Sequence, residues 1–115
     1  MKHDSLAYIH DIDDEITRIE KFLTGISEDV FYRDEKTHYA IARSFEIIGE
    51  ASHQLSKEFK GKFPGIPWRE ISDTRNILIH VYSEINLKRI WDIIQKDLPI
   101  LKTQINEILT NVGQD

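Results

Sequence analysis

The sequence contains no cysteine among its 115 residues, which excludes disulfides, thiolate zinc sites and cysteine nucleophiles. It also lacks any apolar run close to the roughly 20 residues that cross a bilayer, and its polar start, Met1–Ser5, is unlike a secretory signal. We therefore expect a cytoplasmic protein without a membrane segment. The length predicts one domain over residues 1–115, with a thin core that a second subunit would help to bury.

Positive charge is scarce in the first third of the chain. Residues 1–36 carry five basic and ten acidic side chains, whereas residues 37–115 carry ten of each. Between His53 and Trp91, seven basic side chains outnumber four acidic ones. This local excess could hold a phosphate backbone, and its members include Lys57, Lys60, Lys62 and Arg69. The alternative is that both regions are ordinary solvated surfaces.

No segment alternates apolar and polar residues with period two over a useful length, so the sequence predicts helices rather than strands. From Leu6 to Ile26 apolar residues recur every three or four positions, which predicts a first helix that ends near Gly25. A second helix, residues 34–57, is apolar on most sides, as is typical of the centre of a bundle. Within it Gly49 costs about 1 kcal/mol relative to alanine, so we expect another backbone to approach closely.

Glycine and proline gather in one place, residues 59–67, which we interpret as the one clear connection. Pro67 suits the first turn of a third helix that runs from Trp68 to about His80. After a short gap, Asn86 is a good amino-terminal cap for a fourth helix.

Pro99 lies inside the fourth helix and removes one backbone donor, so we expect a bend near Lys96. The apolar residues of this helix follow a pattern close to a heptad seam. Together the four segments predict an all-α, up-down bundle of four to five helices.

Arg75 is the unusual residue of the third helix. On an ideal helical wheel it falls in the middle of the apolar face that Trp68, Ile71 and Leu78 define. A buried guanidinium is costly unless a partner or a wet cleft compensates it. One interpretation is an internal ion pair with Glu46 or Glu50 of the second helix; the other is a cleft that takes a ligand.

Two further side chains follow at the predicted end of that helix. Alone, His80 has an ordinary interpretation as a helix-end cap, and Tyr82 as a core aromatic with a surface hydroxyl. Together with Arg75 they complete the segment Arg-Asn-Ile-Leu-Ile-His-Val-Tyr over residues 75–82. This segment resembles the Arg-x4-His-x-Tyr motif of HepT-like toxins in the HEPN superfamily of helical ribonucleases.

The resemblance extends to the flanks of the motif, over about three-quarters of the chain. Residues 45–51, 63–71 and 87–101 resemble the family's second helix, its approach to the catalytic helix and its fourth helix. Two departures stand beside the motif. Thr74 occupies a position where the family often has methionine, and residues 83–86 replace a common Phe-Gly turn.

The resemblance implies metal-independent cleavage of RNA, with transfer RNA a favoured target. The RNA supplies its own nucleophile, the 2′-hydroxyl, so the protein needs only to move protons and stabilise charge. His80 can transfer protons near neutral pH, Arg75 can clamp the phosphate oxygens, and Asn76 can orient either group. On the wheel Arg75 and His80 point about 140° apart. The family combines two motifs at a dimer-interface cleft, which implies a homodimer or higher homo-oligomer.

The same resemblance implies a regulatory partner, a nucleotidyltransferase antitoxin of the MNT type. Such an antitoxin silences the toxin by attaching AMP to the motif tyrosine, here Tyr82. The added bulk and negative charge beside Arg75 and His80 would block an incoming phosphate.

The sequence leaves one alternative function, a non-catalytic helical module that binds a nucleotide or a nucleotidyltransferase and uses Arg75 for phosphate contact. We expect no cofactor. We also expect no metal site, because His10 and Asp14 share a helix face without an evident third ligand.

Overall fold

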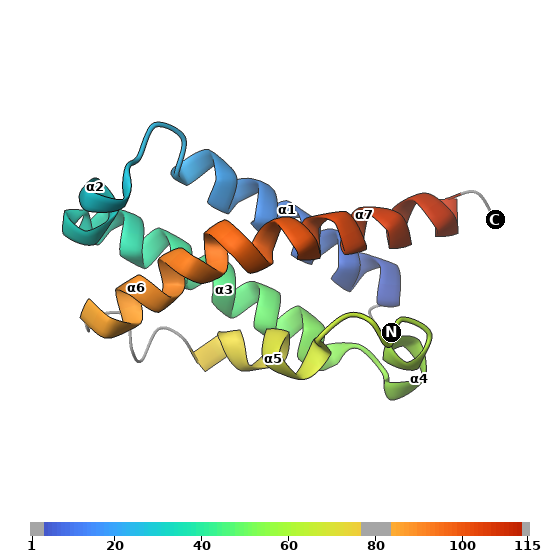
Figure 1. Ribbon diagram of the computed structural model, residues 1–115. Coiled ribbons are helices and arrows are strands. Elements are labelled where there is room, and N and C mark those ends of the chain that lie inside the picture. The colour runs from blue at the N-terminus through green and yellow to red at the C-terminus, as the bar shows by residue number, and fades with distance from the viewer. Residues whose placement is uncertain (1–3, 77–83, 114–115) are drawn as a thin grey trace.

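The computed structural model describes residues 4–76 and 84–113. Within these ranges the chain is helical, with no strand. The long helices run up and down along a body of 45 × 26 × 26 Å (Figure 1). They are α1 (Ser5–Phe22), α3 (Glu35–Gln54) and α7 (Leu98–Gly113), accompanied by the shorter α5 (Trp68–Asp73) and α6 (Glu84–Asp92). The all-α bundle predicted from the sequence is confirmed.

Helix α3 lies at the centre, as its apolar circumference predicts. Helix α1 packs along one side of it and α5 along another, while α7 packs against α1. The core that these helices enclose is rich in isoleucine: Ile9, Ile12, Ile16 and Ile19 of α1 are at most 1% exposed. In the described ranges, no helix is both long and apolar enough to cross a membrane.

Two short helices were not predicted from the sequence. Helix α2 (Glu28–Arg33) begins at Ser27, whose hydroxyl accepts a hydrogen bond from the backbone N–H of Val30. Helix α4 (Lys57–Gly61) begins at Ser56, capped in the same way. The prediction of a connection over residues 59–67 was therefore wrong at its start. The Ser56 hydroxyl accepts the backbone N–H of Phe59, which would otherwise lack a partner, and this cap favours a helical turn.

The predicted stop near Gly25 and the predicted start near Asp34 agree with the structure, whereas the second helix ends at Gln54, three residues before the predicted Lys57. Gly25 follows α1 in the left-handed region with a φ of 76°, where glycine carries no steric penalty. Asp34 caps α3 by accepting hydrogen bonds from the backbone N–H and the hydroxyl of Thr37. These bonds favour the charged carboxylate, so the pKa of Asp34 lies below its ordinary value.

The predicted fourth helix is divided by a π-turn, η2 (Ile93–Asp97), between α6 and α7. The Leu98 N–H reaches back to the Ile93 carbonyl, one residue further than in an α-helix. The widened turn ends two residues before Pro99, which has no N–H to donate, so a π-turn lies where the sequence predicted a bend near Lys96. Asn86 is not the cap, because α6 already begins at Glu84.

The third helix is shorter than predicted. Helix α5 ends at Asp73, and a 3₁₀ turn follows over residues 74–76. The predicted extension to His80 passes into the segment outside the described residues. Since the wheel had assumed one ideal helix, its angle for Arg75 does not hold.

Candidate functional site

The candidate site lies at the carboxyl end of α5, where Arg75 and Asn76 occupy the 3₁₀ turn. His80 and Tyr82, the other two motif side chains, lie outside the described residues. The geometry that can be followed is therefore that of Arg75, Asn76 and the helices around them.

Gly49 of α3 sets the position of Arg75. A Cβ atom built on Gly49 would lie 2.4 Å from the backbone nitrogen of Arg75 and 2.9 Å from its Cα. Such distances are far below van der Waals contact, so only glycine lets the turn settle this deeply against α3. The close backbone approach predicted for Gly49 is confirmed, and the approaching backbone is that of the motif arginine.

Thr74 fixes the same turn with its side chain. Its hydroxyl lies 2.7 Å from the Ile71 carbonyl and 3.0 Å from the Phe45 carbonyl of α3, so it can donate to either. Methionine could make neither bond. The departure from the family pattern at this position therefore supplies a polar anchor for the start of the motif.

Hydroxyl groups continue this contact along α5. Ser52 of α3 donates to the Trp68 carbonyl at 3.4 Å, and Ser72 of α5 donates to the Ser52 hydroxyl at 3.1 Å. Ser52 is fully buried, so these bonds satisfy groups that water cannot reach. One face of α3 thus holds α5 through small and polar residues.

Arg75 is half-buried, and among the described residues no ion pair involves it. The two carboxylates proposed as its partners are engaged elsewhere: Glu46 bonds Arg43 at 2.9 Å, and Glu50 accepts from Gln54 at 3.0 Å. Both expectations, a position inside the apolar face and an internal ion pair, were therefore wrong. The short α5 and its tight turn lift the side chain toward solvent and leave the guanidinium available to a ligand.

A hollow of about 510 Å³ lies beside the guanidinium; we call it the Arg75 hollow. Its lining combines both signs of charge with hydrogen-bonding groups from α1, α3 and the 3₁₀ turn. It includes Tyr8, Asp11, Arg43, Glu46, Glu50, Gln54, Arg75 and Asn76. A volume of this size admits a nucleotide-sized group.

A larger groove of about 980 Å³ runs along the other side of the turn, between α5 and the helices α6, η2 and α7. We call it the α5–α6 groove. Its floor is apolar and includes Phe45 and Ile48 of α3, while Asn76 forms part of its rim. Asn76 lines the Arg75 hollow as well, so the motif turn is a ridge between the two depressions.

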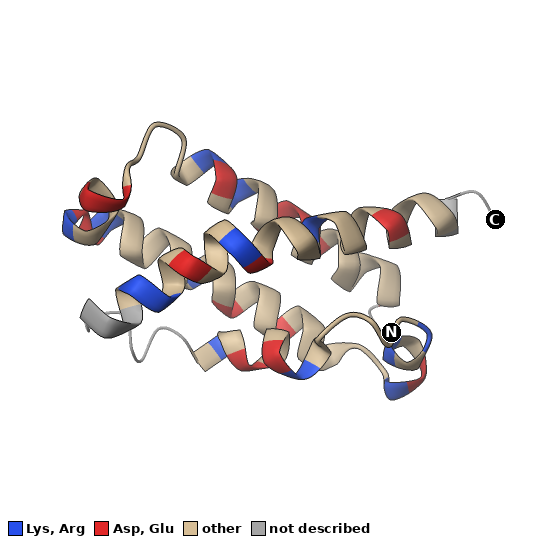
Figure 2. Cartoon of the chain, viewed as in Figure 1, with Lys and Arg blue, Asp and Glu red and all other residues tan. Residues whose placement is uncertain are grey.

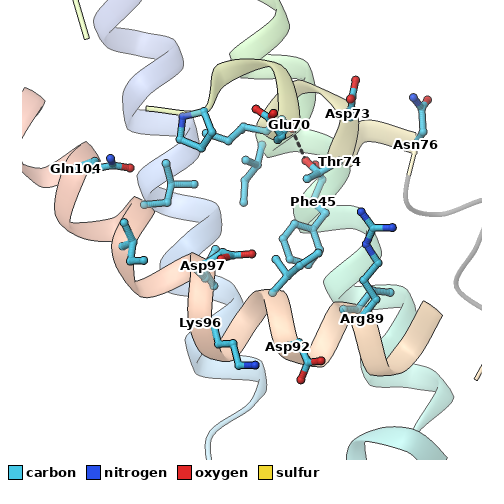
Figure 3. Close-up of a pocket in the computed structure, with 18 of the residues that line it drawn as sticks. Phe45, Glu70, Asp73, Thr74, Asn76, Arg89, Asp92, Lys96, Asp97 and Gln104 are labelled. Atoms are coloured by element: carbon cyan, nitrogen blue, oxygen red, sulfur yellow. Dashed lines mark hydrogen bonds between the residues drawn. The ribbon is translucent and has the colours of Figure 1, made fainter. Parts of the chain in front are cut away.

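Figure 3 shows how charged side chains stand around the α5–α6 groove. Arg89 rises from α6 toward the wall that carries Thr74 and Asn76, whereas Asp92 and Lys96 point away from that wall. Lys88, which precedes Arg89 in the sequence, forms ion pairs with Asp92 at 3.2 Å and with Glu28 at 3.3 Å. Asp92 and Glu28 raise the pKa of Lys88 above its ordinary value. Their negative charges balance the positive charge that Lys88 carries.

The four basic residues proposed to bind RNA lie at the opposite end of α5 from the motif. Lys57, Lys60 and Lys62 belong to α4 and its end, and Arg69 to the first turn of α5 (Figure 2). The Trp68 indole N–H lies 3.2 Å from the Lys60 carbonyl and 3.1 Å from that of Phe63, which ties the two helices together. These four residues line neither the hollow nor the groove.

In residues 4–76 and 84–113, no group of three or more His, Asp or Glu side chains could hold a metal ion.

Comparison with known proteins gives consistent results. The profile of a family described as "Ribonuclease HepT-like" matches residues 12–108. A "Probable ribonuclease HepT" of Thermococcus cleftensis is 38% identical over 94% of this chain and 98% of its own length. A "Putative RNase" of Methanocaldococcus jannaschii is 36% identical over 90% of this chain and 95% of its own length. A "Putative RNase" of Caldanaerobacter subterraneus is 41% identical over 89% of this chain and 91% of its own length. No solved structure matches.

Proposed function

Because the chain belongs to the HepT-like ribonuclease family, we propose that it is a metal-independent endoribonuclease toxin whose preferred substrate is transfer RNA. The observation that carries this proposal is the state of Arg75. Its backbone is fixed against Gly49, while its side chain forms no ion pair among the described residues and borders a hollow. A fixed arginine without a carboxylate partner is suited to an incoming phosphate.

The cleavage follows from the chemistry of RNA. The 2′-hydroxyl attacks the adjacent phosphorus, the bond to the 5′-oxygen breaks, and a 2′,3′-cyclic phosphate and a 5′-hydroxyl remain. His80 transfers the proton that this exchange requires. Arg75 stabilises the negative charge that develops on the non-bridging oxygens, and Asn76 positions the phosphate or the imidazole from the adjoining turn position.

We assign the complete site to a homodimer or a higher assembly. Each of two subunits then contributes one motif, with its Arg75 and His80, and the two motifs meet across a shared cleft. The half-exposed position of Arg75 at the end of α5 supports this arrangement, since a partner can reach it. We also propose that the protein works in the cytoplasm, where it would meet transfer RNA.

Regulation follows from the motif tyrosine. An MNT-type nucleotidyltransferase antitoxin would present ATP to Tyr82; the tyrosine oxygen attacks the α-phosphorus, a new oxygen–phosphorus bond forms, and pyrophosphate leaves. The attached AMP places a negative phosphate beside Arg75 and competes with RNA. Co-expression with a nucleotidyltransferase encoded beside this protein should add the mass of AMP at Tyr82, and modification only at other residues would contradict the assignment.

The activity is tested with purified protein and bulk transfer RNA in the presence of EDTA. We expect cleavage products with 2′,3′-cyclic phosphate ends, and a loss of at least about 100-fold in rate for Arg75→Ala and His80→Ala. Lys21→Gln, a change of one exposed charge on α1, should leave the rate unchanged. No cleavage by the unaltered protein would favour the non-catalytic nucleotide-binding module.

A further inference from the structure

A basic side chain of α6 faces the motif turn from across the α5–α6 groove. Arg89 is exposed, and within the described ranges it takes part in no ion pair. Figure 3 shows its guanidinium extending over the groove toward the wall of Thr74 and Asn76. Its position distinguishes it from the other cations of the groove, because Lys88 is paired with two carboxylates and Lys96 points away from α5.

Four acidic residues line the groove, Glu70, Asp73, Asp92 and Asp97, and within the described ranges none of them forms an ion pair with Arg89. Asp92 is bonded to Lys88 and points away from α5. Asp73 stands on the α5 wall and Asp97 on η2, and neither forms an ion pair with Arg89. The end of the groove nearest the motif therefore presents the Arg89 guanidinium together with the amide of Asn76, while Asp73 lies on the same wall.

The two arginines flank a single ridge. Arg75 borders the hollow on one side of Asn76, and Arg89 borders the groove on the other side, while Asn76 itself lines both. A strand of RNA that crosses this ridge would meet Arg75, then Asn76, then Arg89 in succession. Guanidinium groups bind phosphates well, so one arginine on each side of Asn76 is suited to hold two phosphates of the same strand.

We propose that Arg89 is an RNA-binding residue that holds a phosphate next to the scissile one, so that the strand passes over the motif turn into the α5–α6 groove. This proposal rests on the ribonuclease function proposed above. Arg89 is a positioning residue: it fixes the strand on the groove side of the motif turn, while Arg75 acts on the other side. The half-buried Ile93 on the lining of the groove then offers apolar surface to the base of the held nucleotide.

The test uses a fluorescent 2′-O-methyl RNA oligonucleotide, which lacks the attacking hydroxyl and reports binding without cleavage. Arg89→Gln should weaken binding about 5- to 20-fold, as expected for loss of one charge-assisted contact. The slope of log affinity against log salt concentration should fall by about 0.7, the value for one phosphate contact on a single strand. Arg89→Lys should restore most of the affinity, and Lys21→Gln should match the unaltered protein in both measurements.

A second readout separates positioning from catalysis. With transfer RNA, Arg89→Gln should raise KM by the same factor as it weakens binding, while kcat stays within about twofold, because uniform binding energy is lost. Unchanged affinity and salt slope for Arg89→Gln, with normal thermal unfolding, would overturn the proposal. Loss of affinity only in a Lys57→Gln/Lys60→Gln variant would move the RNA to α4 instead.

Failure of the proposed function gives a different result. If the unaltered protein does not cleave transfer RNA, the ribonuclease proposal fails, whereas the binding measurements still decide the role of Arg89.

Discussion

The two sides of α3 are packed by opposite means. Toward α1, the contact consists of branched apolar side chains, including Ile12 and Ile16 of α1, both at most 1% exposed. Toward α5, it consists of a glycine, a buried serine and a threonine hydroxyl that reaches a carbonyl. The first side buries apolar area and so contributes most to stability. The second side also buries Trp68 and Ile71 of α5, but its polar contacts are what fix where Arg75 lies.

The largest stability effect is expected on the α1 side. Ile16→Ala removes three methyl or methylene groups from a site where the side chain is 1% exposed, so we expect a loss of about 3 kcal/mol in the free energy of unfolding. Denaturant unfolding measures it. The specific activity of the protein that remains folded should be unchanged, and a loss of activity ahead of unfolding would contradict the division between the two sides.

Gly49→Ala tests the α5 side. The added Cβ would overlap the backbone of Arg75, so the 3₁₀ turn must move, at a cost of about 1 to 2 kcal/mol after the better helix propensity of alanine is counted. The effect on RNA cleavage should be much larger, at least about 10-fold in kcat/KM, because Arg75 is displaced from the phosphate. Gly61→Ala, where nothing lies within 4 Å of the new Cβ, is the matched control.

An intact rate for Gly49→Ala, with the expected small change in stability, would show that the position of Arg75 does not depend on this contact. Rates and unfolding curves measured on the same preparations separate the two effects.

Thr74→Val gives the smallest of the three effects. Valine keeps the shape of threonine but removes the hydroxyl that reaches Phe45 and Ile71, so we expect a loss of about 1 kcal/mol in the free energy of unfolding. Thermal unfolding measures it against Thr103→Val, whose hydroxyl bonds only its own exposed helix. Equal costs for both variants would mean that the hydroxyl does not anchor the turn.

Much of the fold could be predicted from the sequence because the long helices obey simple periodicity. The isoleucine spacing of α1 and the apolar circumference of α3 identify these helices, and Gly49 identified a close approach before its partner was known. The two serine-capped helices α2 and α4 were missed because each is too short for a periodic pattern. The sequence did carry their helix caps, Ser27 and Ser56. Each serine hydroxyl accepts a hydrogen bond from the backbone N–H three residues later.

The site was less accessible to such reasoning. The motif identifies Arg75, but its surroundings depend on where α5 stops, and a helical wheel assumes that the helix continues. The tight turn at residues 74–76 depends on a hydroxyl reaching another helix, which periodicity does not encode. Arg89 was counted among the basic residues, but its orientation across the groove is a tertiary property that no local pattern announces.

The π-turn at Ile93–Asp97 has a consequence for the orientation of α6. Such a turn is equivalent to one extra residue inserted into a continuous α-helix. Deleting a residue there would restore regular spacing but rotate α6 by about 100° against α7. Arg89 would then swing off the groove, while Ile90, now buried, would turn with it. The direction in which Arg89 faces is thus set by the one additional residue of the π-turn, which begins four residues further along the chain.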